Sequence, residues 1–131
     1  MSCEALPKIV AVDFDGTLVD DEYPAVGAPK KEIFELFKLL QRRGVKIILW
    51  TCRNDRQLDE AVQCCIDNGL TPDAVNANIP EVIEAYGGDT RKVFADLYYD
   101  DKSIPNTQAP LYWLKRLGFN YFDLYNCTRE G

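Results

Sequence analysis

Apolar runs and amphipathic segments alternate along this chain. Residues 8–13 (KIVAVD) and 45–50 (VKIILW) are almost continuously apolar, a pattern typical of strands that are covered on both faces of a sheet. The segment between them opens at Pro29, closes at Gly44 and has the apolar spacing of one helix face, at Ile33, Leu36, Phe37 and Leu40. The pattern therefore predicts a strand, a helix and a second strand.

The same alternation continues through the rest of the chain. A second helix is expected to start at Asn54, which can form a capping box with Gln57, and to stop at Gly69. Later segments predict a strand at 74–77, a helix at 80–86, a strand at 93–99, a helix at 111–117 and a strand at 119–125. Because strands and helices alternate without a repeat or a linker, we expect one α/β domain with a doubly wound, mostly parallel, Rossmann-like sheet and helices on both faces.

Length and composition agree with a single folded domain. The chain has 131 residues, of which 47% are hydrophobic and 27% charged, the usual balance for a globular protein. No apolar run approaches the length of a transmembrane helix, and the first residues lack the pattern of a signal peptide. We therefore expect one domain over residues 1–131, located in the cytoplasm and without a membrane partner.

The charge balance and the absence of histidine narrow the possible chemistry. Lys and Arg number 15 against 21 Asp and Glu, a net charge of -6, which repels a phosphate backbone and argues against a nucleic-acid partner. The chain has no histidine, so a Ser-His-Asp triad and a His-ligated metal are excluded. The five cysteines are odd in number and lack C-x-x-C spacing, which favours reduced thiols over a disulfide framework.

Polar residues cluster where the predicted strands end. Asp13-Phe14-Asp15-Gly16-Thr17 follows the first strand, Thr51 and Arg53 follow the second, and Lys92 precedes the strand that ends in Asp100-Asp101. Ligands of such sheets bind at the carboxyl ends of the strands. We therefore expect these four clusters to converge on one edge of the sheet.

In this order the clusters resemble the motifs of the haloacid dehalogenase superfamily of phosphohydrolases. Those motifs are a strand ending in Asp-x-Asp-x-Thr, a strand ending in Thr or Ser, a later Lys or Arg, and a strand ending in paired acids; the matching residues are Asp13, Asp15, Thr17, Thr51, Lys92, Asp100 and Asp101. The resemblance covers residues 8–104 and is strongest to small bacterial and phage members. It implies a phosphatase with an aspartyl-phosphate intermediate.

The resemblance also assigns roles to the acidic residues. Asp13 is expected to attack phosphorus as the nucleophile, while Asp15 protonates the leaving oxygen and later deprotonates the attacking water. Asp13 and Asp100 are expected to ligate the metal directly through their carboxylates. Asp15 is expected to ligate it through its backbone carbonyl, and Asp101 to act through a water molecule or by orienting the other ligands.

The electrostatics of the acids require a cation. Four carboxylates stand against the single positive charge of Lys92, and a phosphate monoester adds about two more negative charges at neutral pH. A divalent ion is needed to bring such groups together. Oxygen ligands favour Mg²⁺.

The remaining polar residues are expected to contact the phosphate. By the same resemblance, Thr51 would donate a hydrogen bond to a phosphoryl oxygen and Lys92 would neutralise charge on the transferring group. For Arg53 two interpretations stay open, a contact on the phosphate side and a surface charge near the start of its helix.

The chain leaves little room for the cap domain with which this superfamily selects substrates. Only a short segment separates Thr17 from Pro29, enough for a turn and a small flap that carries the acidic run Asp20-Asp21-Glu22. We therefore expect an open, capless site. In capless relatives this implies a bulky substrate or a neighbouring subunit as a lid, so the expected partners are a phosphorylated small molecule or an exposed phosphate monoester, and a second copy of the chain.

Three other functions are alternatives to hydrolysis. Phosphotransfer to a sugar is disfavoured because no cap excludes water from the intermediate. A receiver domain of a signalling pathway has a similar length, fold and set of residues, but it carries its acidic pair on the first strand and its phosphoacceptor on the third. Here Asp-x-Asp comes first and the paired acids come last. A catalytically silent binding protein on the same scaffold is the third alternative.

Overall fold

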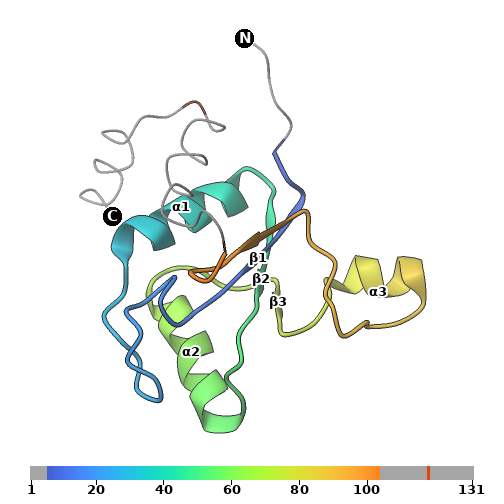
Figure 1. Cartoon of the computed structure of the whole chain (residues 1–131). Helices are drawn as coiled ribbons and strands as arrows, with labels where there is room; N and C mark the ends of the chain where they lie inside the picture. The colour runs from blue at the N-terminus through green and yellow to red at the C-terminus, as the bar shows by residue number, and fades with distance from the viewer. Residues whose placement is uncertain (1–5, 104–117, 119–131) are drawn as a thin grey trace.

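A parallel sheet of four strands forms the centre of the computed structural model, which describes residues 6–103 and 118 (Figure 1). The strands are β1 (Ile9–Val12), β2 (Lys46–Leu49), β3 (Ala74–Val75) and β4 (Leu97–Tyr99), in the order β3-β2-β1-β4. β1 pairs in parallel with both β2 and β4, in a register that sets Val12 opposite Leu49 and Tyr99. The carboxyl ends of these three strands therefore meet at one edge of the sheet.

Three helices connect the strands of the described part: α1 (Lys31–Arg42), α2 (Asp55–Asp67) and α3 (Pro80–Tyr86). They lie where the sequence predicts helices. In α1 the apolar spacing does bury one face, although Phe34 is buried in place of the half-buried Ile33. The expected capping box at Asn54 is not formed, because this residue makes no side-chain hydrogen bond to the start of α2.

The core lies on both faces of the sheet. Val10 and Val12 of β1 pack in one buried cluster with Phe37 of α1 and Ala61 of α2. The alternate β1 residues, Ile9 and Ala11, pack in a second cluster on the opposite face, with Ile48, Ile79 and Val93. This alternation confirms the prediction of one α/β domain with a parallel, Rossmann-like sheet covered on both sides.

The last described strand is shorter than the sequence predicts. The pattern predicted a strand from residue 93, but β4 begins only at Leu97. Before it, the Phe94 N–H donates to Asn78 Oδ1 at 2.6 Å and Val93 packs in the second core cluster. Backbone pairing with β1 starts at Asp96, whose N–H donates to the Ile9 carbonyl at 2.8 Å. The predicted helix at 111–117 and strand at 119–125 lie outside the described residues.

Two further expectations concern cysteines and membranes. Cys52, Cys64 and Cys65 are all free thiols in the structure, while Cys3 and Cys127 lie outside the described residues. Within 6–103 and 118, no helix has both the length and the apolar character needed to cross a bilayer.

Candidate functional site

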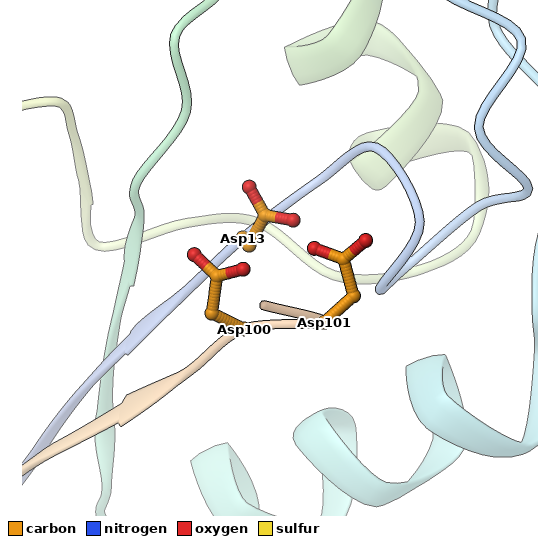
Figure 2. A group of neighbouring side chains, drawn as sticks. All are labelled: Asp13, Asp100 and Asp101. Atoms are coloured by element: carbon orange, nitrogen blue, oxygen red, sulfur yellow. The ribbon is translucent and has the colours of Figure 1, made fainter. Parts of the chain in front are cut away.

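Three carboxylates lie side by side at the ends of two adjacent strands (Figure 2). Asp13 follows β1, and Asp100 and Asp101 follow β4. The Asp13 N–H donates to the Tyr99 carbonyl at 2.9 Å, which extends the β1–β4 pairing up to the acids. Each residue offers one carboxylate oxygen, and these oxygens lie within 4.8 Å of one another. We call Asp13, Asp100 and Asp101 the acid cluster.

Thr17 ties the two halves of the acid cluster together. Its hydroxyl donates to Asp13 Oδ2 at 3.0 Å and accepts the Asp101 N–H at 2.9 Å, and the side chain is buried. Gly16 stands against the same cluster, since a Cβ built on it would run into Asp101 Oδ2, and its φ of +83° favours glycine. The Gly-Thr pair of the first motif is therefore needed for the geometry of the carboxylates.

Crowding shifts the pKa values inside the acid cluster. Burial, and then the charge of Asp100, raise the pKa of Asp13 to about 7. Burial also raises the pKa of Asp100. Burial works in the same direction at Asp101, but hydrogen bonds from the Asp100 and Asp13 carboxyls outweigh it and lower the pKa of Asp101. Asp13 and Asp100 thus resist ionisation as long as only protein groups surround them.

Among the described residues, a lysine that pairs with this cluster is largely in solvent. Lys102 Nζ lies 3.5 Å from Asp101 Oδ2, but the lysine side chain is 81% exposed, so water and salt screen the pair. A second lysine, Lys30, donates from Nζ to the Gly16 carbonyl at 3.1 Å and so braces the loop between Asp13 and Thr17. An oxygen-only donor set with excess negative charge suits a hard divalent cation such as Mg²⁺.

Asp15 does not join the acid cluster. Its carboxylate forms a two-pronged ion pair with Arg53, whose Nε donates to Oδ2 at 2.8 Å and whose Nη2 donates to Oδ1 at 2.7 Å. The hydrogen bonds to Asp15, and to a smaller extent its negative charge, raise the pKa of Arg53 above its ordinary value. The structure therefore separates the two acids of the Asp-x-Asp motif.

Arg53 is neither a phosphate contact nor a surface charge in this structure. Only 2% of the residue is exposed. Besides its two bonds to Asp15, it donates to the carbonyls of Pro24, Ala25 and Gln57 at 3.2, 2.7 and 3.2 Å, so all five guanidinium N–H groups have acceptors. No donor is left for a phosphate. The sequence offered one signal for this pairing, an arginine and an acid that follow neighbouring strands.

Thr51 stands at the expected edge of the sheet. It follows β2, next to β1, and its N–H donates to Asn76 Oδ1 at 2.8 Å. Its hydroxyl accepts the Arg53 N–H at 3.2 Å, so the hydroxyl proton remains to be donated.

Lys92, in contrast, is not brought to the acid cluster. It precedes β4 whereas Asp100 follows it, so the strand separates the two residues. The exposed Lys92 side chain lies over the Tyr98 ring, with Nζ 5.7 Å from the ring centre. The expected phosphate contact is thus not seen, because the segment 92–96 approaches the sheet from the opposite end of the strand.

Comparisons with known proteins extend the description of the fold. No family model matches the chain, and no curated protein matches it. A solved structure described as that of a conserved protein from Bacteroides thetaiotaomicron is similar over 89% of this chain and 96% of its own, with 36% sequence identity and a TM-score of 0.70.

Proposed function

We propose that this chain, which belongs to the same family as that conserved protein from Bacteroides thetaiotaomicron, is a Mg²⁺-dependent phosphohydrolase. It would cleave phosphate monoesters through an aspartyl phosphate on Asp13. The observation that supports this most is the acid cluster, in which the first acid of an Asp-x-Asp-Gly-Thr motif lies beside the paired acids that follow β4. This is the arrangement that a resemblance to the haloacid dehalogenase superfamily implies.

Asp13, Asp100 and Asp101 are the residues that would hold the metal. Their oxygens lie within 4.8 Å of one another, which is close enough for one ion to contact carboxylates from both strand ends. The pKa of Asp13 is raised to about 7 by burial and then by the negative charge of Asp100, and a bound cation would offset both effects. Bound Mg²⁺ would supply the positive charge that keeps these groups ionised and lets an anionic phosphate approach.

In this proposal Asp13 acts as the nucleophile. The Thr17 hydroxyl fixes Asp13 Oδ2 from one side, which orients the carboxylate before the substrate arrives. In the first step an Asp13 oxygen forms a bond to phosphorus, and the bond to the leaving oxygen breaks. In the second step water attacks the same phosphorus, inorganic phosphate leaves and Asp13 is restored. Thr51, at the same edge, would donate its hydroxyl proton to a phosphoryl oxygen.

The test is hydrolysis of p-nitrophenyl phosphate by the purified chain. We expect turnover that requires Mg²⁺ and is abolished by a chelator. Asp13→Asn should lower kcat by at least about a thousandfold, because removal of a nucleophile leaves only binding and electrostatic effects.

Asp59→Asn is the matched control for this experiment. It makes the same chemical change at an exposed position of α2, so its activity should equal that of the wild type. Turnover without a metal, or an active Asp13→Asn protein, would contradict the proposal. Mg²⁺ binding without turnover of any phosphate ester would favour the alternative of a silent binding protein.

A further inference from the structure

We propose that Arg53 determines the substrate class of this site: by occupying both oxygens of Asp15, it restricts cleavage to phosphates whose leaving oxygen departs without receiving a proton from the protein. Aryl phosphates and acyl phosphates belong to this class, and alkyl phosphates do not. The inference rests on the proposed phosphohydrolase function and names its substrates more narrowly.

Hydrogen bonds and two aromatic rings hold the Asp15–Arg53 ion pair in place. Arg53 Nε and Nη2 meet Asp15 Oδ2 and Oδ1 at 2.8 and 2.7 Å, a fork in which each oxygen has its own donor. The guanidinium carbon lies 5.2 Å from the centre of the Phe14 ring and 5.1 Å from that of the Tyr23 ring, which adds cation–π attraction. The two side chains are 1% and 17% exposed, so water does little to screen the pair.

Arg53 cannot follow Asp15 toward a substrate. Its remaining donors are bound to the carbonyls of Pro24 and Ala25 in the flap and of Gln57 in α2. If the Asp15 side chain turned to the leaving oxygen, it would give up both charge-assisted hydrogen bonds and leave a buried guanidinium without its counter-ion. The structure therefore keeps Asp15 in a structural pair, in spite of its place in the Asp-x-Asp motif.

The chemistry of the first step then depends on the leaving group alone. The Asp13–phosphorus bond forms and the bond from phosphorus to the leaving oxygen breaks, with its electron pair going to that oxygen. A phenolate or a carboxylate carries this pair stably: the carboxylate stays ionised at neutral pH, and the phenolate takes a proton from water after it has left. An alkoxide is far more basic and needs a proton as the bond breaks. A general acid that donates this proton raises the rate by about a hundredfold or more.

Matched pairs of substrates test this on the wild-type protein with Mg²⁺. Phenyl and cyclohexyl phosphate have similar size but differ in the basicity of the leaving oxygen, as do acetyl and ethyl phosphate. The quantity to measure is kcat/KM, which reports formation of the phosphoenzyme. We expect the first member of each pair to react about a hundredfold faster or more. Smaller ratios would overturn the inference, since they mean that a protein group protonates the leaving oxygen.

Variants of Arg53 ask whether this residue causes the preference. Arg53→Met frees both Asp15 oxygens, and Arg53→Lys keeps the charge but loses the fork. In either variant the phenyl-to-cyclohexyl ratio should fall at least about tenfold, and an unchanged ratio would refute the role of Arg53. If Arg53→Met does not fold, Arg53→Lys decides.

A control variant tests whether the effect is specific to Arg53, and the results distinguish failure of the proposed function from failure of this inference. Arg56→Met removes an exposed arginine of the same helix and should keep the wild-type ratio. A wild-type protein that hydrolyses none of the four phosphates refutes the proposed function, and this inference with it. A protein that hydrolyses them without the expected preference refutes only the inference about Arg53.

Discussion

At the scale of single residues, Asp13 combines its proposed role with a cost to the fold. Its pKa rises to about 7 from an ordinary value of 3.8, so between these values the folded protein binds a proton that the unfolded chain has lost. The contribution of Asp13 to stability therefore falls as the pH rises through this window, and it is lost above pH 7. The crowding that suits the residue for a metal destabilises the metal-free protein.

Asp13→Asn should therefore stabilise the metal-free protein at pH 8. The amide removes the charge but can still accept the Thr17 hydrogen bond, so the free energy of unfolding should rise by about 1–2 kcal/mol after allowance for solvent. Urea unfolding in a chelator at pH 8 and pH 5 measures this. The advantage of the variant should shrink at pH 5, where wild-type Asp13 is protonated in the fold. An equal or larger advantage at pH 5 would contradict the assigned cause.

Gly16→Ala should strain the backbone at residue 16 and, in addition, displace the Asp101 carboxylate in the acid cluster. Its positive φ alone costs about 1–2 kcal/mol for a residue with a Cβ, and here the Cβ also meets Asp101 Oδ2. Gly87→Ala is the matched control, because Gly87 has a φ of +77° and nothing within 4 Å of its Cβ. Both variants should lose stability, but only Gly16→Ala should weaken Mg²⁺ binding measured by calorimetry. Equal Mg²⁺ affinity in the two would count against the close contact at Gly16.

The sequence predicted some of these residues and missed others for a physical reason. Asp13, Asp100 and Asp101 come directly after strands, so knowledge of the strand order was enough to bring them together. The partner of Asp15 depends on the path of the flap and on the burial of Arg53 between two rings, and neither follows from local spacing.

At the scale of elements, the direction of β4 decides which residues can reach the site. A parallel strand carries its two ends to opposite edges of the sheet, so Asp100 reaches the acid cluster while Lys92 remains behind at Tyr98. Within residues 6–103, the order and type of the elements were predictable from apolar periodicity. The start of β4 was not, because an extended apolar segment becomes a strand only where a neighbouring backbone is available to pair with it.

Lys92→Met should consequently leave hydrolysis nearly unchanged. With the lysine on the other side of β4, kcat/KM for p-nitrophenyl phosphate should stay within about twofold of the wild type, the range of surface substitutions. A large loss in Lys92→Met would show that this segment approaches the acid cluster during turnover.

Thr51→Val removes the hydroxyl that follows β2 and should lower kcat/KM for the same substrate by about tenfold or more.

At the scale of the whole molecule, an acidic chain concentrates part of its charge at one edge of its sheet. The net charge is -6, and the acid cluster adds local repulsion that a bound divalent ion would relieve. Mg²⁺ should therefore stabilise the fold by mass action, by about 2.7 kcal/mol at a concentration a hundred times the Kd. Thermal unfolding with and without Mg²⁺ measures this, and Asp100→Asn should largely remove the shift. A shift of equal size in Asp100→Asn would place the ion elsewhere.

The identity of the phosphorylated residue tests the central claim most directly. The protein is mixed with acetyl phosphate and Mg²⁺, quenched in acid and digested, and the peptides are read by mass spectrometry. We predict a phosphoryl group on Asp13 that is absent in a chelator and absent in Asp13→Asn. Hydrolysis that proceeds with the phosphoryl group on another residue, or with none on Asp13 at any quench time, would contradict the account.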